Sequence, residues 1–260
     1  GSERPDWVVI AAARVGGIVA NSSYPVEFLT ENLRIEMNLI EACHAADIER
    51  VLFLGSSCIY PRLAPQPIRE EFLLTGELEP TNEPYALSKI VGIKLVQAYR
   101  RQYGRSWISA MPTNLYGPND NFDLESSHVL PAMLRKFDDA KQCGAESVTL
   151  WGTGTPRREF LHVDDLARAC LHLLKNYDES DPVNVGTGED VEIRELATLV
   201  SSVVGFKGSI EWDTSKPDGT PRKVLNVSKI RELGWSPFVN LEKGVSSTYE
   251  WYLKHRSNLQ

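Results

Sequence analysis

The sequence contains Arg50-Val51-Leu52-Phe53-Leu54-Gly55, a short apolar run that ends at a glycine. Such a run is typical of a strand buried on both faces of a parallel sheet. Similar runs occupy residues 7–13 and 107–111, and helical patterns cover residues 25–46 and 84–103 between them. Strands that alternate with helices predict right-handed βαβ units. We therefore expect an α/β fold built on a Rossmann-like parallel sheet.

The pattern changes after residue 114, where proline-rich loops interrupt shorter elements. A helix near residues 164–174 and a strand at 183–185 are expected to return to the sheet. Residues 193–204 carry the apolar stripe of a packed helix. We expect a dinucleotide-binding domain over residues 1–115 and a smaller C-terminal α/β substrate-binding lobe over residues 116–260. Segments near residues 160–190 would rejoin the first domain.

The composition argues against several classes of protein. Hydrophobic residues make up 42% of the chain and charged residues 24%, which is ordinary for a globular protein. No apolar run approaches the roughly 20 residues of a membrane-spanning helix. A net charge of −7 argues against nucleic acid as a partner. The four cysteines form no C-x-x-C pair, which favours a reduced, cytoplasmic protein, and the histidines and cysteines lack metal-ligand spacing.

Tyr85 and Lys89 stand four residues apart, so a helix over 84–103 places both side chains on one face. A neighbouring ammonium favours the tyrosinate, which lets the phenol exchange a proton near neutral pH. The spacing is common, and a solvated pair on the helix surface is the alternative. Ser56 favours the catalytic interpretation, because it follows a strand and ligands of open α/β sheets bind at the carboxyl ends of strands. This order of strand, serine and Tyr-Lys helix is used by short-chain dehydrogenase/reductases.

Cys58 and His128 are candidates for acid–base chemistry on a sugar ring. A thiolate beside a sugar ketone can remove a proton from a carbon acid, whereas most free cysteines are small buried hydrophobes. In extended chain, Ser56 and Cys58 would point the same way. His128 precedes the apolar start of a helix, where it would either supply the acid on the opposite face of a ring carbon or serve as a cap or core residue.

Five segments together resemble the GDP-L-fucose synthases, a group of extended short-chain reductases, and they are distributed over nearly the whole chain. Residues 55–61, 82–86, 112–118, 151–160 and 216–223 read GSSCIYP, NEPYA, PTNLYGP, WGTGTPRREF and KPDGTPRK. The resemblance implies an NADPH-dependent enzyme that converts GDP-4-keto-6-deoxy-D-mannose to GDP-L-fucose by 3,5-epimerisation and 4-keto reduction. It also implies a homodimer packed through the helix at 84–103.

The resemblance assigns a role to each catalytic candidate. Tyr85 would protonate the C4 oxygen, with Lys89 holding the nicotinamide ribose and lowering the pKa of the tyrosine. Ser56 would orient the keto oxygen, and Cys58 and His128 would serve as base and acid for inversion at C3 and C5. The NADP(H)-binding positions it implies are Leu54, Gly55, Ser56, Ser57, Tyr85, Lys89, Pro112, Thr113, Asn114, Leu115 and His128. The substrate-binding positions it implies are Lys136, Trp151, Arg158, Asp218 and Lys223, of which Lys136 occupies a position that can be arginine in the family.

One part of a dinucleotide fold is absent from the sequence. No glycine-rich turn follows a strand, although such a turn brings backbone N–H groups to the cofactor pyrophosphate. Members of the family begin earlier, so we expect an N-terminally truncated sheet and weak binding of NADPH by this chain alone. The alternatives are a non-catalytic GDP-sugar-binding fragment, a nucleotide-sugar 4-epimerase and a 4,6-dehydratase. Dehydratases usually carry an Asp-Glu pair where this chain has Cys58-Ile59.

Overall fold

The computed structural model describes residues 5–216 and 218–258, so Pro217 of the segment 216–223 lies outside the described residues. Its largest sheet has four parallel strands in the order β1-β2-β3-β8. These are β1 (Trp7–Ile10), β2 (Arg50–Leu54), β3 (Ile108–Pro112) and β8 (Val183–Val185). The predicted α/β fold with a Rossmann-like parallel sheet is confirmed.

The first strand is shorter than the apolar run at 7–13 predicts. It ends at Ile10, and the chain then approaches Asn32 of the second helix, which spans Pro25–Ala45. The side-chain amide of Asn32 accepts a hydrogen bond from the Arg14 backbone N–H at 2.7 Å and donates one to the Arg14 carbonyl oxygen at 3.0 Å. These bonds satisfy backbone groups that a longer strand would have paired within the sheet.

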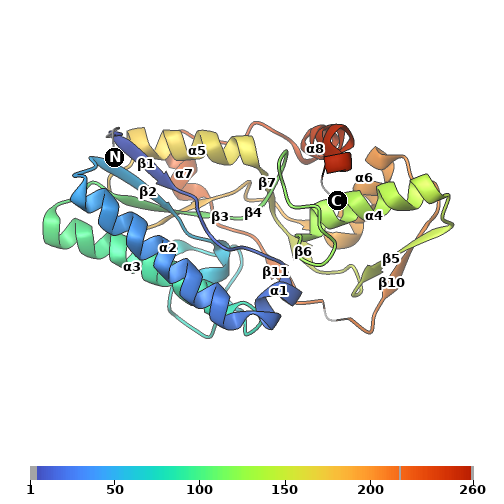
Figure 1. The fold of residues 1–260 in the computed structure, drawn as a ribbon, viewed down its shortest axis with the longest axis horizontal. Helices are drawn as coiled ribbons and strands as arrows, with labels where there is room; N and C mark the ends of the chain where they lie inside the picture. Colours follow the sequence, from blue (N-terminus) through green and yellow to red (C-terminus); the bar gives the residue numbers. More distant parts are fainter. Residues whose placement is uncertain (1–4, 217, 259–260) are drawn as a thin grey trace.

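Helices cover both faces of the sheet (Figure 1). α2 (Pro25–Ala45) follows the short α1 (Ile18–Ser23) and packs beside α3 (Glu83–Tyr103) on one face, while α5 (Val163–Asn176) lies on the other. α7 (Ser228–Glu232) packs against β8. The close approach of α3 to β2 requires a glycine, because a Cβ at Gly92 would lie 2.3 Å from the Phe53 ring.

The second half of the chain is built on shorter elements. Its helices are α4 (Val129–Cys143), α6 (Ile193–Val204) and α8 (Leu241–His255). Two parallel pairs join β5 (Ser147–Trp151) to β10 (Ser209–Asp213) and β4 (Asn114–Tyr116) to β7 (Phe160–His162). A third small sheet places β6 (Arg157–Arg158) between β11 (Arg222–Lys223) and β9 (Val191–Glu192). Single 3₁₀ turns occupy Ser57–Ile59, Glu70–Phe72 and Arg256–Asn258.

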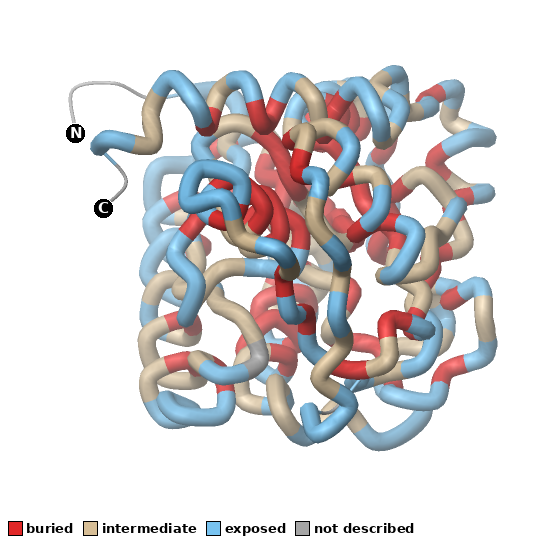
Figure 2. Tube along the Cα trace, turned by 90° about the vertical axis from the view of Figure 1, so that its right-hand side faces the viewer, coloured by how far each residue is buried: buried red, intermediate tan, exposed pale blue. Residues whose placement is uncertain are grey.

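Buried apolar side chains form two clusters. The first lies between the four-stranded sheet and its helices and includes Leu52, Phe53 and Trp107. The second, which includes Phe137 and Leu196, joins α4, α6 and α8 to the short strands. Figure 2 shows the buried segments gathered inside the molecule, with exposed residues along its outside. Among the described residues, we find no helix with the length and apolar character needed to cross a membrane.

Candidate active site

The carboxyl end of β2 continues into the single 3₁₀ turn Ser57–Ile59, which presents Ser56 and Cys58. Ser56 caps this turn, because its Oγ accepts a hydrogen bond from the Cys58 backbone N–H at 3.2 Å. The backbone is therefore a tight turn rather than extended chain. Both side chains are partly exposed, so one hydroxyl and one thiol lie at the sheet edge where ligands of α/β proteins bind.

Tyr85 lies one turn before Lys89 on α3, and its side chain hydrogen-bonds Ser56. Burial raises the pKa of Tyr85 and the neighbouring Cys58 raises it further, while the hydrogen bond with Ser56 lowers it only in part. This direction differs from the expected lowering by Lys89. The Lys89 ammonium instead contacts the Glu36 carboxylate at 3.2 Å and donates to the Leu54 carbonyl oxygen at 3.1 Å.

Two side chains from distant segments donate to the sulfur of Cys58. Asn82 Nδ2 and Lys223 Nζ each lie 3.5 Å from Sγ. Asn82 occupies the N-cap position of α3, but its side chain makes no capping hydrogen bond because its amide is directed at the thiol. The charge of Arg158 also interacts with Cys58. Two donors and the charge of Arg158 therefore surround the sulfur, and a thiol acts as a base through its thiolate.

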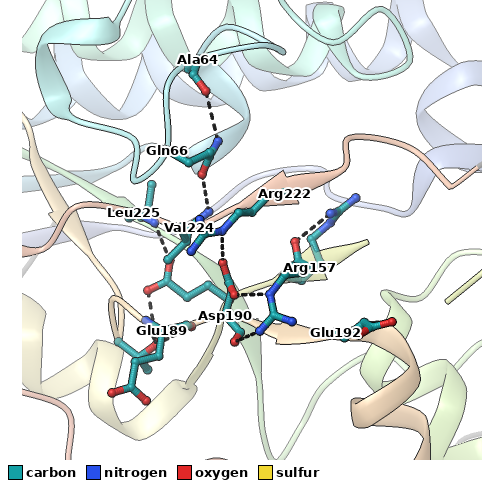
Figure 3. A network of polar contacts seen from close by, with 12 residues as sticks. Ala64, Gln66, Arg157, Glu189, Asp190, Glu192, Arg222, Val224 and Leu225 are labelled. Carbon is teal, nitrogen blue, oxygen red and sulfur yellow. Dashed lines mark hydrogen bonds and ion pairs between the residues drawn. The ribbon is translucent and has the colours of Figure 1, made fainter. Parts of the chain in front are cut away.

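The small sheet of β6, β9 and β11 determines where Arg158 and Lys223 point. Lys223 pairs with Arg158 and Arg222 pairs with Arg157 in the parallel register. Arg157 Nε donates to Asp190 Oδ1 at 2.6 Å and Arg222 Nε donates to Oδ2, so one carboxylate joins both strands (Figure 3). Because side chains alternate along a strand, the next residue on each strand faces the opposite way, toward Cys58.

Trp151 forms an exposed aromatic surface at the end of β5. The ammonium of Lys136 lies 5.7 Å from the centre of its ring and that of Lys216 lies 5.5 Å from it. Asp218 lies close by, where its carboxylate accepts hydrogen bonds from the Thr153 backbone N–H at 2.7 Å and hydroxyl at 2.8 Å. A flat ring flanked by two cations can stack on a planar group and attract an anion.

The positions expected to bind the cofactor line the carboxyl ends of β2 and β3. A Cβ at Gly55 would lie 2.5 Å from the Met111 sulfur, so a larger residue there would displace the Met111 side chain. Asn114 Nδ2 donates to the Glu159 carbonyl oxygen at 2.8 Å, which fixes the segment that includes Pro112, Thr113 and Leu115. Ser57 is buried beside this edge, with 3% of its surface exposed.

His128 is not joined to the other catalytic candidates. It is the exposed N-cap of α4, and within residues 5–216 and 218–258 its side chain makes no hydrogen bond. The preceding backbone contacts the loop before α1, since Gly17 N–H donates to the Ser126 carbonyl oxygen at 3.0 Å. Ser56, Cys58, Tyr85 and Lys89 thus cluster with Arg158 and Lys223, whereas among the described residues no hydrogen bond or ion pair joins His128 to them.

Sequence reasoning missed three residues of this region, namely Glu36, Asn82 as a partner of the thiol, and Lys216. Glu36 had a detectable signal, because it follows Phe28 and Asn32 at intervals of four residues on the buried face of α2. The contacts of Asn82 and Lys216 depend on tertiary packing. The described residues contain no group of three or more histidine, cysteine or acidic side chains able to hold a metal ion.

Comparison with known proteins agrees with this arrangement. Residues 1–186 match the model of the "NAD dependent epimerase/dehydratase family". GDP-L-fucose synthase 1 of Arabidopsis thaliana is 59% identical over 256 residues, which cover 98% of this chain and 79% of the relative. GDP-L-fucose synthase of Escherichia coli K12 is 54% identical over 268 residues, covering 100% and 84%.

A solved structure gives the same result for the fold. The GDP-L-fucose synthetase of Naegleria fowleri bound to NADP superimposes with a TM-score of 0.90 at 31% identity, over 98% of this chain and 78% of that one. Because both the family model and relatives well above 30% identity cover most of the chain, its membership is established. The chain belongs to the NAD dependent epimerase/dehydratase family and, within it, to the GDP-L-fucose synthases.

Proposed function

We propose that this chain catalyses the NADPH-dependent conversion of GDP-4-keto-6-deoxy-D-mannose to GDP-L-fucose, by 3,5-epimerisation followed by reduction of the C4 ketone. The main support is the convergence of Ser56, Cys58, Tyr85 and Lys89 at the end of β2. The family membership supports the same reaction.

Epimerisation needs a base and an acid on opposite faces of the sugar. The C4 ketone makes the hydrogens on C3 and C5 acidic, so the Cys58 thiolate takes a proton from one carbon and leaves an enolate. His128 returns a proton to the other face of the same carbon. Cys58 then releases the proton it has taken to solvent before it acts on the second carbon. Lys223 and Asn82 contact the Cys58 sulfur and hold it in position during this exchange.

Reduction then uses the residues of α3. NADPH, when bound, supplies the hydride to C4. Tyr85 donates its phenolic proton to the C4 oxygen, and Ser56, which hydrogen-bonds Tyr85, orients that oxygen. Lys89 would hold a cofactor hydroxyl with its free donor, and the residues at 54–57 and 112–115 would line the cofactor. A general acid positioned in this way contributes about 10²- to 10⁴-fold to the rate.

The GDP portion of the substrate extends toward the second half of the chain. Arg158 and Lys223 offset the charge of the diphosphate, and a guanidinium suits two phosphate oxygens at once. Trp151 with Lys136 offers a stacking surface, and Asp218 holds the neighbouring loop against Thr153. Lys136 carries charge without the planar fork of an arginine, so we assign it a weaker contact.

We further propose that the protein acts in the cytoplasm as a homodimer that packs through α3. The outward face of this helix carries Leu87, 39% exposed, and Val91, 43% exposed, which are apolar side chains that a partner helix would cover. The division of the chain near residue 115 stays a prediction. A 4-epimerase, a 4,6-dehydratase or an inert fragment has less support, because none of them needs a thiol held by Lys223 and Asn82.

The decisive experiment is product analysis after the protein is mixed with GDP-4-keto-6-deoxy-D-mannose and NADPH in deuterated water. We expect GDP-L-fucose that carries deuterium at C3 and C5. Cys58→Ser should abolish the deuterium incorporation, whereas Cys143→Ser, which changes an exposed cysteine, should leave it unchanged. Reduced product without deuterium would instead indicate a simple ketone reductase and would contradict the proposal.

A further inference from the structure

The buried partner of Lys89 has no part in the mechanism described so far. Glu36 projects from α2 into the interior, and its side chain is 1% exposed, while that of Lys89 is 2% exposed. The ammonium and carboxylate lie 3.2 Å apart. Apart from this ion pair, neither carboxylate oxygen has a hydrogen-bond partner among the described residues. Glu36 therefore depends on Lys89 for its only compensation.

Stability does not explain why an ion pair lies here. Removing two charges from water is costly, and replacing a buried pair by apolar side chains of similar size is often neutral or stabilising. The neighbours of Glu36 on the buried face of α2 include Phe28, Ile40 and Cys43, which an apolar side chain would complement. The carboxylate is retained at a position that contacts one of the residues proposed to serve the reduction.

The contacts of Lys89 use two of its three hydrogen-bond donors. An ammonium has three N–H donors. One faces the Leu54 carbonyl oxygen at 3.1 Å and another faces Glu36, while the ring of Phe53 lies 4.8 Å from the nitrogen. A single donor is left for a ligand. Without Glu36, the ammonium would be held only by one carbonyl oxygen and an aromatic ring.

We propose that Glu36 is a positioning residue of the reductase site, whose buried carboxylate keeps the Lys89 ammonium charged and fixed against the carboxyl end of β2. The inference rests on the proposed function, because it gives Lys89 a purpose in the reduction. The titratable side chains that interact with Glu36 are Lys89 and Tyr85 of α3, and Cys58 interacts in turn with Tyr85. β1, which packs against α2, contributes only apolar side chains.

The electrostatics of the pair agree with this role. Burial lowers the pKa of Lys89, and the charge of Glu36 opposes that lowering. Burial raises the pKa of Glu36 to about 7, although Lys89 lowers it. Burial disfavours the charged form of each side chain, and the opposite charge of the partner favours it, so each partner helps to keep the other ionised. Removal of the carboxylate should let Lys89 lose its proton at a lower pH.

The test uses Glu36→Gln, which keeps the shape of the side chain and removes its charge. In protein labelled with ¹³C at the lysine ε-carbons, the Lys89 signal is assigned by its loss in Lys89→Met. We expect the titration midpoint of Lys89 to fall by about one pH unit or more in Glu36→Gln. In the profile of kcat against pH for ketone reduction, the alkaline limb should move to lower pH by the same amount. At high pH this corresponds to a tenfold loss of rate for each pH unit of the shift.

Two controls separate positioning from a general effect on folding. Glu41→Gln removes an exposed carboxylate from the same helix and should leave both the midpoint and the alkaline limb unchanged. Exchange of deuterium at C3 and C5, measured without a reductant, depends on Cys58 and should stay within twofold of the wild type in Glu36→Gln. A lower melting temperature with an unchanged Lys89 midpoint and alkaline limb would overturn the inference and leave Glu36 a purely structural residue.

A reciprocal measurement covers the case in which Glu36→Gln does not fold. In Lys89→Met, labelled at the glutamate carboxyl carbons, the midpoint of Glu36 should rise, because its compensating cation is gone. An unchanged midpoint would also overturn the inference. If the wild type neither exchanges deuterium nor oxidises NADPH with the keto sugar, the proposed function fails, whereas the titrations still decide whether Glu36 controls the charge of Lys89.

Discussion

The ammonium of Lys223 lies 3.5 Å from the sulfur of Cys58, although 165 positions separate the two residues in the sequence. Cys58 follows the central sheet, while Lys223 belongs to the two-residue strand β11. The contact places a positive charge beside the sulfur, and a thiol reacts through its thiolate. The proposed base of the epimerisation is therefore assembled from two distant parts of the chain.

Lys223→Met should slow the alkylation of Cys58 by iodoacetamide at neutral pH by about five- to tenfold, since the loss of one nearby charge is worth about 1 kcal/mol or more. The rate is measured by mass spectrometry of the peptide that contains Cys58. Lys254→Met, which removes an exposed cation from the end of α8, serves as the control and should react like the wild type. An unchanged rate in Lys223→Met would mean that the ammonium does not act on the sulfur.

Tyr85→Phe should separate the two halves of the reaction. Loss of the phenolic proton should lower the rate of NADPH oxidation by about 10²- to 10⁴-fold. Deuterium exchange at C3 and C5 should persist, because Cys58 and its contacts with Asn82 and Lys223 remain. Tyr103→Phe changes an exposed phenol at the other end of the same helix and should affect neither rate. Loss of both activities in Tyr85→Phe would contradict the separation.

Asp190→Asn should destabilise the protein in a pH-dependent way. Burial alone would raise the pKa of Asp190, but the hydrogen bonds from Arg222 and Arg157 outweigh it and lower the pKa. The stabilisation is therefore present above the unfolded pKa of about 4 and is lost as the pH falls through the folded value. We expect a loss of about 1–3 kcal/mol in the free energy of unfolding at neutral pH.

Urea unfolding of Asp190→Asn and wild type at several pH values tests this prediction. The difference between the two proteins should shrink once the pH falls below about 4. Glu189→Gln, a change at the exposed neighbouring residue, should leave stability within about 0.5 kcal/mol of the wild type. A difference that stays constant with pH would argue against an ionised Asp190 as the link between β6 and β11.

Gly92→Ala should destabilise the first cluster. The added Cβ would lie 2.3 Å from Phe53 Cζ and less than 3 Å from two further carbons of that ring. Accommodating it must move α3 or the ring, which costs about 1–3 kcal/mol in a well-packed core. Thermal unfolding measures the loss, and Leu171→Ala at an exposed position of α5 is the control. A melting temperature equal to that of the wild type would show that the contact relaxes freely.

The local pattern of apolar residues in the sequence predicts those parts of the fold that are built on long periodic strands and helices. The runs around β2 and β3 and the helix patterns of α2, α3 and α6 predicted the sheet, and Ser56, Tyr85 and Lys89 followed from their places on these elements. Glu36 could have been found in the same way, as a charge on the apolar stripe of α2. Strands of two residues, such as β6 and β11, carry no detectable period, so their pairing was not predictable.

Other contacts depend on packing that no local pattern encodes. Asn82 reads as a helix cap, and only the approach of the turn at 57–59 shows that its amide binds the Cys58 sulfur instead. The charge partner of Lys89 lies on another helix, so the spacing between Tyr85 and Lys89 does not show which group the ammonium contacts. Spacing identifies candidate groups, whereas their partners come from the tertiary fold.

The alternation along β6 and β11 has a consequence for how this region can change. Arg157 and Arg158 have the same side chain, yet Arg157 is bound to Asp190 and Arg158 faces the thiol of Cys58. A substitution at either position alters one side chain, but an insertion or deletion of a single residue ahead of them would exchange the two directions and remove both functions together. Loop length before Arg157 and before Arg222 is therefore under tighter constraint than loop composition, and length variants should fail where most point variants survive.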